Sequence, residues 1–259
     1  MREATAPNAR AALLQRRAAD RLGWSGPLLM LFARPALAVI AQGLVAAIYA
    51  AQGSTAPWRD AGTWLPVYAI LIDGGCLFLL WRLTRREGIG LNDLIGFDRR
   101  RLGRDLLLGL ALIPPGLAFI LGGNFGAAWL VYGHFDMPEV FGALPLGAAL
   151  YAVLVFPLLW GVVEQTTYNG YVLPRLQALS GRTWLAVAMV AVIWSGQHAE
   201  MPLTFDSSFM LYRLLSPLPF STSIILVWLR LRRILPLAIA HWLMDGASAF
   251  LSVLWPLLR

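Results

Sequence analysis

The sequence predicts an all-α integral membrane protein, a bundle of about seven transmembrane helices, with six to eight compatible with the pattern. Hydrophobic residues make up 58% of the 259 positions and charged residues only 14%. The mean hydropathy of +0.64 is too high for a soluble domain of this size. Several windows also reach the ~20 apolar residues that a helix needs to cross a bilayer.

Seven apolar segments carry this prediction, and no linker between them is long enough to separate domains. We expect the spans at about 28–50, 64–81, 105–130, 146–172, 183–201, 208–229 and 234–257. Residues 1–27 then form a basic cytoplasmic segment, and residues 28–259 form a single transmembrane domain. Cys76 is the only cysteine and falls within the second span, which excludes an intramolecular disulfide.

The number of arginines alternates between high and low in successive segments that flank the spans. Five arginines precede the first span, and the later segments hold one, seven, none, two, none, three and one in turn. Because arginine is enriched in cytoplasmic loops, the alternation predicts a cytoplasmic N-terminus and an external C-terminus. We therefore attribute the net charge of +7 to topology in a bacterial cell membrane, with the lipid bilayer as partner and no nucleic acid.

The segment 82–105 is rich in arginine and also carries scattered apolar residues such as Ile89, Leu94 and Phe97. Such a mixture is typical of an interfacial segment, since anionic lipids attract arginine while apolar side chains enter the bilayer. We expect an Arg-rich elbow on the cytoplasmic surface, and a nucleic-acid patch is the weaker alternative.

Ionisable side chains inside the predicted spans cost about 2.5–3.5 kcal/mol each on insertion scales, so each requires a partner or a function. These side chains are Arg34, Asp73, Glu164, His198, Arg213, His241 and Asp245. Arg34 is close enough to the cytoplasmic end of its span to snorkel to the surface. Asp73 is expected to pair with Arg34 or Arg213.

Four of these residues, Glu164, His198, His241 and Asp245, form the candidate catalytic site. His241 and Asp245 are four residues apart and share one face of a helix. Two histidines, one glutamate and one aspartate on three helices suit either a zinc site or a water activated by the glutamate. Zinc is therefore a candidate cofactor, with His198, His241 and Glu164 as candidate ligands, although the zinc signature HExxH is absent.

Three motifs over about residues 140–250 resemble those of the CPBP or Abi family of intramembrane proteases, which includes the type II CAAX prenyl endopeptidases. The family motifs EExxxR, FxxxH and HxxxN read here EQTTYN (164–169), WSGQH (194–198) and HWLMD (241–245). The resemblance implies an intramembrane endopeptidase that cleaves a peptide or a membrane protein. It also implies that Glu164 activates water, that His198 holds the water or a metal, and that His241 and Asp245 help to bind the site or stabilise the oxyanion.

This sequence departs from the family pattern at four motif positions. Gln165 and Asn169 replace a glutamate and an arginine that form an ion pair, and a Gln–Asn hydrogen bond can take its place. We expect these two residues to support the site. Trp194 replaces phenylalanine and keeps an aromatic wall. Asp245 replaces asparagine; an ionised carboxylate would repel a forming oxyanion, whereas a protonated one can donate to it. Stronger metal binding is the alternative role of Asp245.

The leading hypothesis is an active endopeptidase whose polar cavity opens to the cytoplasm. One alternative is a family member that has lost proteolysis and serves as a membrane scaffold or maturation factor, which the altered motifs favour. A second alternative is a transporter in which Asp73, Glu164 and Asp245 relay protons. That reading calls for an inverted repeat, which the sequence does not show.

Overall fold

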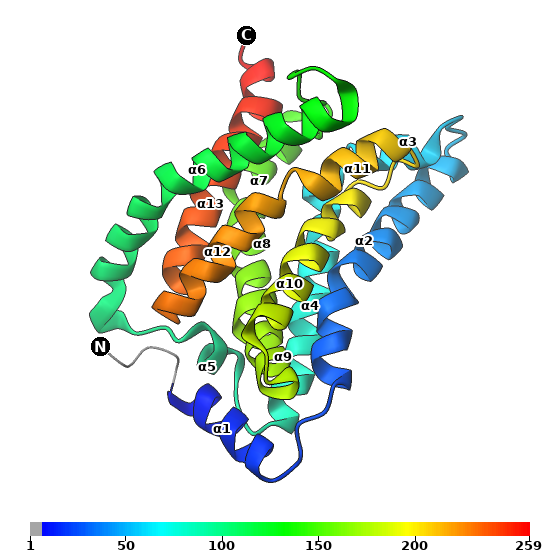
Figure 1. The fold of residues 1–259 in the computed structure, drawn as a ribbon. Coiled ribbons are helices and arrows are strands. Elements are labelled where there is room, and N and C mark those ends of the chain that lie inside the picture. The colour runs from blue at the N-terminus through cyan, green and yellow to red at the C-terminus, as the bar shows by residue number, and fades with distance from the viewer. Residues whose placement is uncertain (1–6) are drawn as a thin grey trace.

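A computed structural model describes residues 7–259, and within this range all regular secondary structure is helical, with no strand (Figure 1). Residues 1–6 of the predicted N-terminal segment, including Arg2 and Glu3, lie outside the described residues. The helices are α1 (Pro7–Ala18), α2 (Ser25–Ala51), α3 (Pro57–Gly62), α4 (Leu65–Arg86), α5 (Leu91–Ile95), η1 (Arg99–Arg101), α6 (Leu102–Tyr132), α7 (Leu146–Leu154), α8 (Phe156–Gln165), η2 (Thr166–Val172), α9 (Leu173–Ser180), α10 (Thr183–Gly196), η3 (Gln197–Glu200), α11 (Ser207–Leu215), α12 (Leu218–Leu231), α13 (Leu235–Ala249), η4 (Phe250–Leu254) and η5 (Trp255–Leu257).

Six helical stretches in residues 7–259 are long and apolar enough to cross a membrane. They are Ser25–Ala51, Leu65–Arg86, Leu91–Tyr132, Leu146–Ser180, Ser207–Leu231 and Leu235–Leu257. The predicted fifth span, 183–201, is occupied by the shorter helix α10 and its continuation η3. The prediction of a polytopic membrane helix bundle is confirmed, and helix α1 and the C-terminus lie at opposite ends of the bundle (Figure 1).

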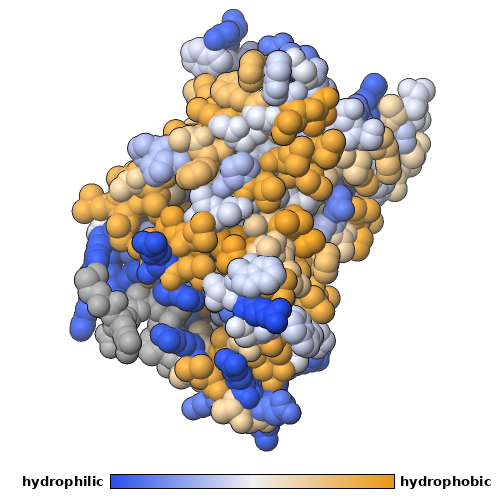
Figure 2. Space-filling model, viewed as in Figure 1, coloured by the Kyte–Doolittle hydropathy of each residue, from blue (hydrophilic) through white to orange (hydrophobic). Residues whose placement is uncertain are grey.

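The surface has the polarity expected of a membrane protein. Apolar residues cover much of the side of the bundle, and hydrophilic residues gather at the end where α1 lies (Figure 2). On α6, Leu107 and Leu130 are 70% and 75% exposed, which suits contact with lipid. The predicted elbow, 82–105, comprises the end of α4, the helices α5 and η1, and the start of α6.

The centre of the bundle is formed by α8, η2 and α13, which carry two of the three motifs. Gly161 on α8 faces α13, where an added Cβ would lie 3.2 Å from the main-chain nitrogen of Trp242 and 3.3 Å from the carbonyl oxygen of Ala238. The two backbones approach closely because position 161 has no side chain. One turn after Gly161 stands Glu164, and η2, a π-helix of the kind often found at functional sites, follows directly.

Candidate active site

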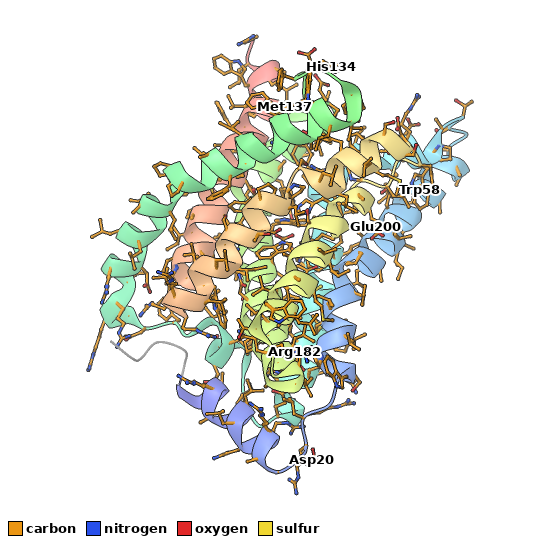
Figure 3. All side chains as sticks on the ribbon, in the orientation of Figure 1. Asp20, Trp58, His134, Met137, Arg182 and Glu200 are labelled. Carbon is orange, nitrogen blue, oxygen red and sulfur yellow. The ribbon has the colours of Figure 1, made fainter. Side chains whose placement is uncertain are left out.

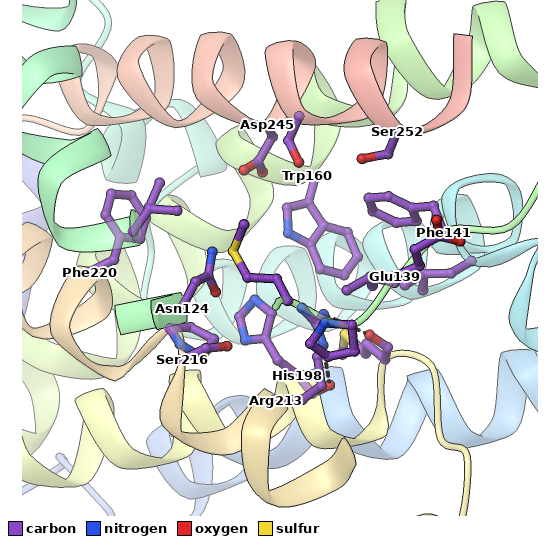
Figure 4. Close-up of a pocket in the computed structure, with 18 of the residues that line it drawn as sticks. Asn124, Glu139, Phe141, Trp160, His198, Arg213, Ser216, Phe220, Asp245 and Ser252 are labelled. Atoms are coloured by element: carbon purple, nitrogen blue, oxygen red, sulfur yellow. Dashed lines mark hydrogen bonds between the residues drawn. The ribbon is translucent and has the colours of Figure 1, made fainter. Parts of the chain in front are cut away.

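A cavity of about 540 Å³ lies within the bundle and contains all four predicted catalytic residues. Glu164, His198, His241 and Asp245 line it, and they come from α8, η3 and α13. In Figure 4, Asp245 projects from one wall, and His198 lies with Arg213 on the opposite wall. The sequence therefore identified residues that the fold does bring to one cavity, although their chemical roles stay predictions.

Glu164 is fully buried and is held by donors on both carboxylate oxygens. The indole Nε1 of Trp194 donates to Oε2 at 2.9 Å, and the amide Nε2 of Gln197 donates to Oε1 at 2.6 Å. Nη2 of Arg34 lies 3.5 Å from Oε1. These contacts fix the orientation of the carboxylate, and the guanidinium compensates part of its charge.

Arg34 does not snorkel to the surface as expected, because its side chain is fully buried in the centre of the bundle. Its Nη1 donates to Oδ1 of Asp73 at 2.7 Å, and its guanidinium lies 4.1 Å from the ring centroid of Trp160. The expected pairing of Asp73 with an arginine is confirmed, with Arg34 as the partner. Arg34 therefore joins Asp73 and Glu164 in one buried charge network.

Gln197 and Tyr168 belong to the same network and were not identified from the sequence. The Oε1 of Gln197 accepts from Nε of Arg34 at 3.2 Å and from the hydroxyl of Tyr168 at 2.9 Å. The ring of Tyr168 stacks on that of Trp194 with centroids 5.0 Å apart. Gln197 directly precedes His198, and that adjacency was the only signal in the sequence that could have marked it.

His241 is held between a side-chain amide and two carboxylates. Its Nδ1 lies 3.3 Å from Nε2 of Gln165, and its Nε2 lies 3.3 Å from Oδ2 of Asp245 and 3.7 Å from Oε2 of Glu164. The Oε1 of Gln165 accepts from Nδ2 of Asn169 at 2.8 Å, so the predicted Gln–Asn hydrogen bond is present. Because the amide nitrogen of Gln165 then faces Nδ1 as a donor, this arrangement assigns the imidazole proton to Nε2.

His198 has the opposite arrangement of its ring nitrogens. Its Nδ1 lies 3.1 Å and 3.2 Å from the carbonyl oxygens of Trp194 and Ser195, so it carries the proton. The Nε2 of this neutral ring is then left as an acceptor. Arg213 donates to the carbonyl oxygens of His198 and Met201, at 3.3 Å and 2.9 Å, and has no ion pair with any residue in the range 7–259.

The described residues do not fit a zinc site. Within residues 7–259, no three His, Cys, Asp or Glu side chains form a group that could hold a metal ion. Both ring nitrogens of His241 already face protein partners, and a guanidinium stands beside Glu164, where it would compete with a metal cation. We therefore derive no chemical step through a metal.

The lining of the cavity extends toward the end of the bundle opposite the Arg-rich segments, whereas we expected an opening to the cytoplasm. Its lining includes Met137 and Phe141 from the segment after α6, together with Ser252 and Pro256 near the C-terminus. Met137 lies at the end of the bundle opposite Asp20 in the α1–α2 turn (Figure 3). Whether the cavity opens to the cytoplasm stays a prediction, because the depth of the motifs within their spans does not show toward which end the helices separate.

Comparison with known proteins gives one match. Residues 145–247 match the sequence model of a family described as Rce1-like, type II CAAX prenyl endopeptidase. The match contains all three motifs and lies within the segment 140–250, so the resemblance inferred from the motifs is confirmed. No curated protein and no solved structure matches the chain.

Proposed function

Residues 145–247 of this chain belong to the family of Rce1-like type II CAAX prenyl endopeptidases, and we propose that the cavity around Glu164 hydrolyses a peptide bond within the membrane. The proposal depends on the orientation and position of the Glu164 carboxylate. Its carboxylate is oriented by Trp194 and Gln197 and charge-compensated by Arg34, yet it lines a cavity large enough to hold water and a peptide segment. A carboxylate that is held in one orientation at the wall of a cavity is what a general base requires.

Glu164 acts as the general base, and His198 holds the second hydrogen of the same water. Both groups line the same cavity, and in this proposal the water is bound between them. A water that donates to the carboxylate and to Nε2 of His198 keeps a lone pair for the substrate carbonyl carbon. General-base assistance of this kind contributes about 10²–10⁴-fold to the rate.

In the proposed hydrolysis, Glu164 takes a proton from water and later returns it to the leaving amine. The water oxygen bonds to the carbonyl carbon while Glu164 takes the proton, which gives a tetrahedral intermediate with a negative oxygen. Collapse of the intermediate breaks the carbon–nitrogen bond, and Glu164 donates its proton to the departing amine. The products are a new carboxyl terminus and a new amino terminus.

Arg213 is the group that we assign to the negative carbonyl oxygen. It lines the cavity, has only main-chain carbonyls as hydrogen-bond partners, and pairs with no carboxylate among the described residues. Asp245 occupies the position of a family asparagine and, when ionised, cannot donate to an oxyanion. A donor aimed at such an oxygen contributes about 2.7–4 kcal/mol to transition-state stabilisation, so Arg213 can supply what Asp245 does not.

The substrate enters from the end of the bundle that holds Met137 and Ser252. If the Arg-rich end faces the cytoplasm, this opening faces the outside. The cavity wall combines apolar side chains such as Phe141, Trp160 and Phe220 with the polar groups already described. A membrane protein or a membrane-associated peptide is the class of substrate that suits this lining.

The test compares Glu164→Gln with wild type on a library of apolar peptides in lipid nanodiscs. Turnover should fall about 10²–10⁴-fold, because the amide keeps the size of the side chain but cannot accept a proton from water. The control is Glu200→Gln, which removes a carboxylate from η3 that does not line the cavity, and it should keep wild-type turnover. Unchanged turnover in Glu164→Gln would refute the assignment of the base.

A second arm of the same experiment adds a chelator. Turnover should be equal with and without it, since the described residues form no set of metal ligands. A loss of turnover that zinc restores would overturn the metal-free mechanism while leaving the protease assignment intact. Absence of any cleavage by wild type would favour a scaffold in place of an enzyme.

A further inference from the structure

A second cavity, of about 340 Å³, lies at the Arg-rich end of the molecule and takes no part in the proposed reaction. One wall is α1, and the other walls are α5, the segment around α9, and the end of α12. It is therefore placed where the membrane-crossing part of the bundle ends and the α1 helix packs beneath it (Figure 1).

Four arginines line this cavity, which are Arg10, Arg17, Arg175 and Arg232. Only Arg175 is neutralised, since its Nε donates to Oε1 of Glu87 at 3.0 Å and its Nη2 pairs with the other carboxylate oxygen. The remaining three have no ion pair with any residue in the range 7–259.

One carboxylate, that of Asp93, also lines the cavity, and it is engaged at the start of α5. Its Oδ2 accepts from the main-chain nitrogen of Gly90 at 2.8 Å and so caps that helix. Among residues 7–259, the cavity therefore has three arginines without an ion pair and one carboxylate that is already hydrogen-bonded. Such an excess of positive charge favours an anion.

Two further observations concern the wall formed by α12. Burial and the neighbouring Arg10 guanidinium lower the pKa of Arg232, so two like charges are held close together. The ring of Trp228, whose centroid is 4.6 Å from the Arg232 guanidinium, is only 1% exposed, and its indole N–H has no hydrogen-bond partner in the part of the chain that the structure describes. A buried donor without an acceptor is unfavourable by itself, and an anion beside it would satisfy it.

The rest of the lining is apolar. Leu13 of α1, Leu94 and Ile95 of α5, and Ile234 before α13 line the same cavity. Arg10 and Arg17 are seven residues apart on α1, about two turns, so they lie on one face of the helix with Leu13 and Leu14 close to it. A site that is cationic at one part and apolar at another suits an amphiphile better than a free ion.

We propose that this cavity binds the phosphate of an anionic membrane lipid, with Arg10, Arg17 and Arg232 around the headgroup and the acyl chains along Leu13, Leu94 and Ile234. The lipid thereby joins α1 to the bundle. Charge complementarity identifies the headgroup, and the position of the cavity at the membrane boundary identifies a lipid as its source.

The test measures the thermal unfolding midpoint of the purified protein in neutral detergent while phosphatidylglycerol is titrated. The altered protein is Arg10→Gln/Arg17→Gln, and its matched control is Arg99→Gln/Arg100→Gln. Arg99 and Arg100 lie in η1, are exposed, and do not line the cavity. Both proteins lose two positive charges near the same surface, so general attraction to anionic lipid falls equally in both.

Wild type and the control should show saturable stabilisation with similar half-saturation, whereas the cavity variant should need about tenfold more lipid. Arg232→Gln, which alters the opposite wall, should weaken lipid binding to a similar extent. Because Arg232 lies outside α1, this variant separates lost binding from an altered folding of α1. Equal weakening in the cavity variant and the control would overturn the proposal in favour of diffuse surface attraction. Equal stabilisation by phosphatidylcholine or by inorganic phosphate would overturn the anionic lipid as the ligand.

Discussion

Gln165 and Asn169 offer a direct test of the network that surrounds His241. Both side chains are fully buried, and Nδ2 of Asn169 donates to Oε1 of Gln165 at 2.8 Å. We consider the changes Gln165→Glu and Asn169→Arg, alone and together. Each single change places a charge in the bundle without a partner of opposite sign at the other position, and we expect each to cost about 3–5 kcal/mol of stability.

The double change restores an ion pair at a spacing of four residues on one helical face. It should therefore cost clearly less than the sum of the single changes, with a coupling free energy of about 3 kcal/mol. Thermal and denaturant unfolding in detergent would measure all four proteins. A control cycle at the exposed positions 15 and 19, Gln15→Glu with Ala19→Arg, should give a coupling of only about 0.3–0.5 kcal/mol.

Additive losses at positions 165 and 169 would refute the reasoning, because they would show that the two side chains do not depend on each other. A coupling no larger than that of the surface control would lead to the same conclusion. The cycle tests only the support of the site and does not depend on whether the protein cleaves a substrate.

Two further predictions concern the base and the cavity opening. Trp194→Phe restores the family residue and keeps an aromatic ring against Tyr168, but it removes the donor to Oε2 of Glu164. Turnover of a peptide substrate should fall about tenfold or more, because one hydrogen bond to a charged group is lost. An unchanged rate would show that the indole N–H does not orient the base. In intact cells, a membrane-impermeant maleimide should label Ser252→Cys at the cavity opening, whereas Ala18→Cys at the end of α1 should react only after permeabilisation. Background labelling should be low because the native Cys76 is buried. The reverse pattern would place the opening on the cytoplasmic side.

The sequence predicted the helix bundle because a membrane span can be recognised from the length of an apolar segment alone. It did not predict where the spans break. The segment 208–229 contains Pro217, where α11 ends and α12 begins, and the segment 146–172 is interrupted at Val155 between α7 and α8. Such breaks depend on packing against other helices, which the hydropathy of one segment does not report.

Within the site, Glu164, His198, His241 and Asp245 could be identified because each is an ionisable group in an apolar setting. Arg34 was placed wrongly, since its distance from the end of α2 suggested access to the surface and said nothing of which face of the helix is buried. Gln197 was missed because the free-energy cost that marks an ionisable side chain within the membrane does not apply to a neutral amide. Both contact Glu164, so the part of the site that orients the carboxylate was the part that the sequence revealed least.

The departures from the family motifs at positions 165, 169 and 245 can be understood as one change that acts through His241. With Gln165, the amide donates to Nδ1 and the imidazole proton resides on Nε2, where it needs an acceptor. Asp245 provides that acceptor at 3.3 Å, and the carbonyl oxygen of an asparagine can accept there as well. A glutamate at position 165 would instead accept from Nδ1–H and leave Nε2 as an acceptor, which the amide of an asparagine satisfies and an ionised aspartate does not. An ionised Asp245 beside a neutral His241 is therefore compatible with Gln165 but not with a glutamate at position 165. Because an ionised Asp245 also has no donor for an oxyanion, the oxyanion is assigned to Arg213 on the opposite wall of the cavity.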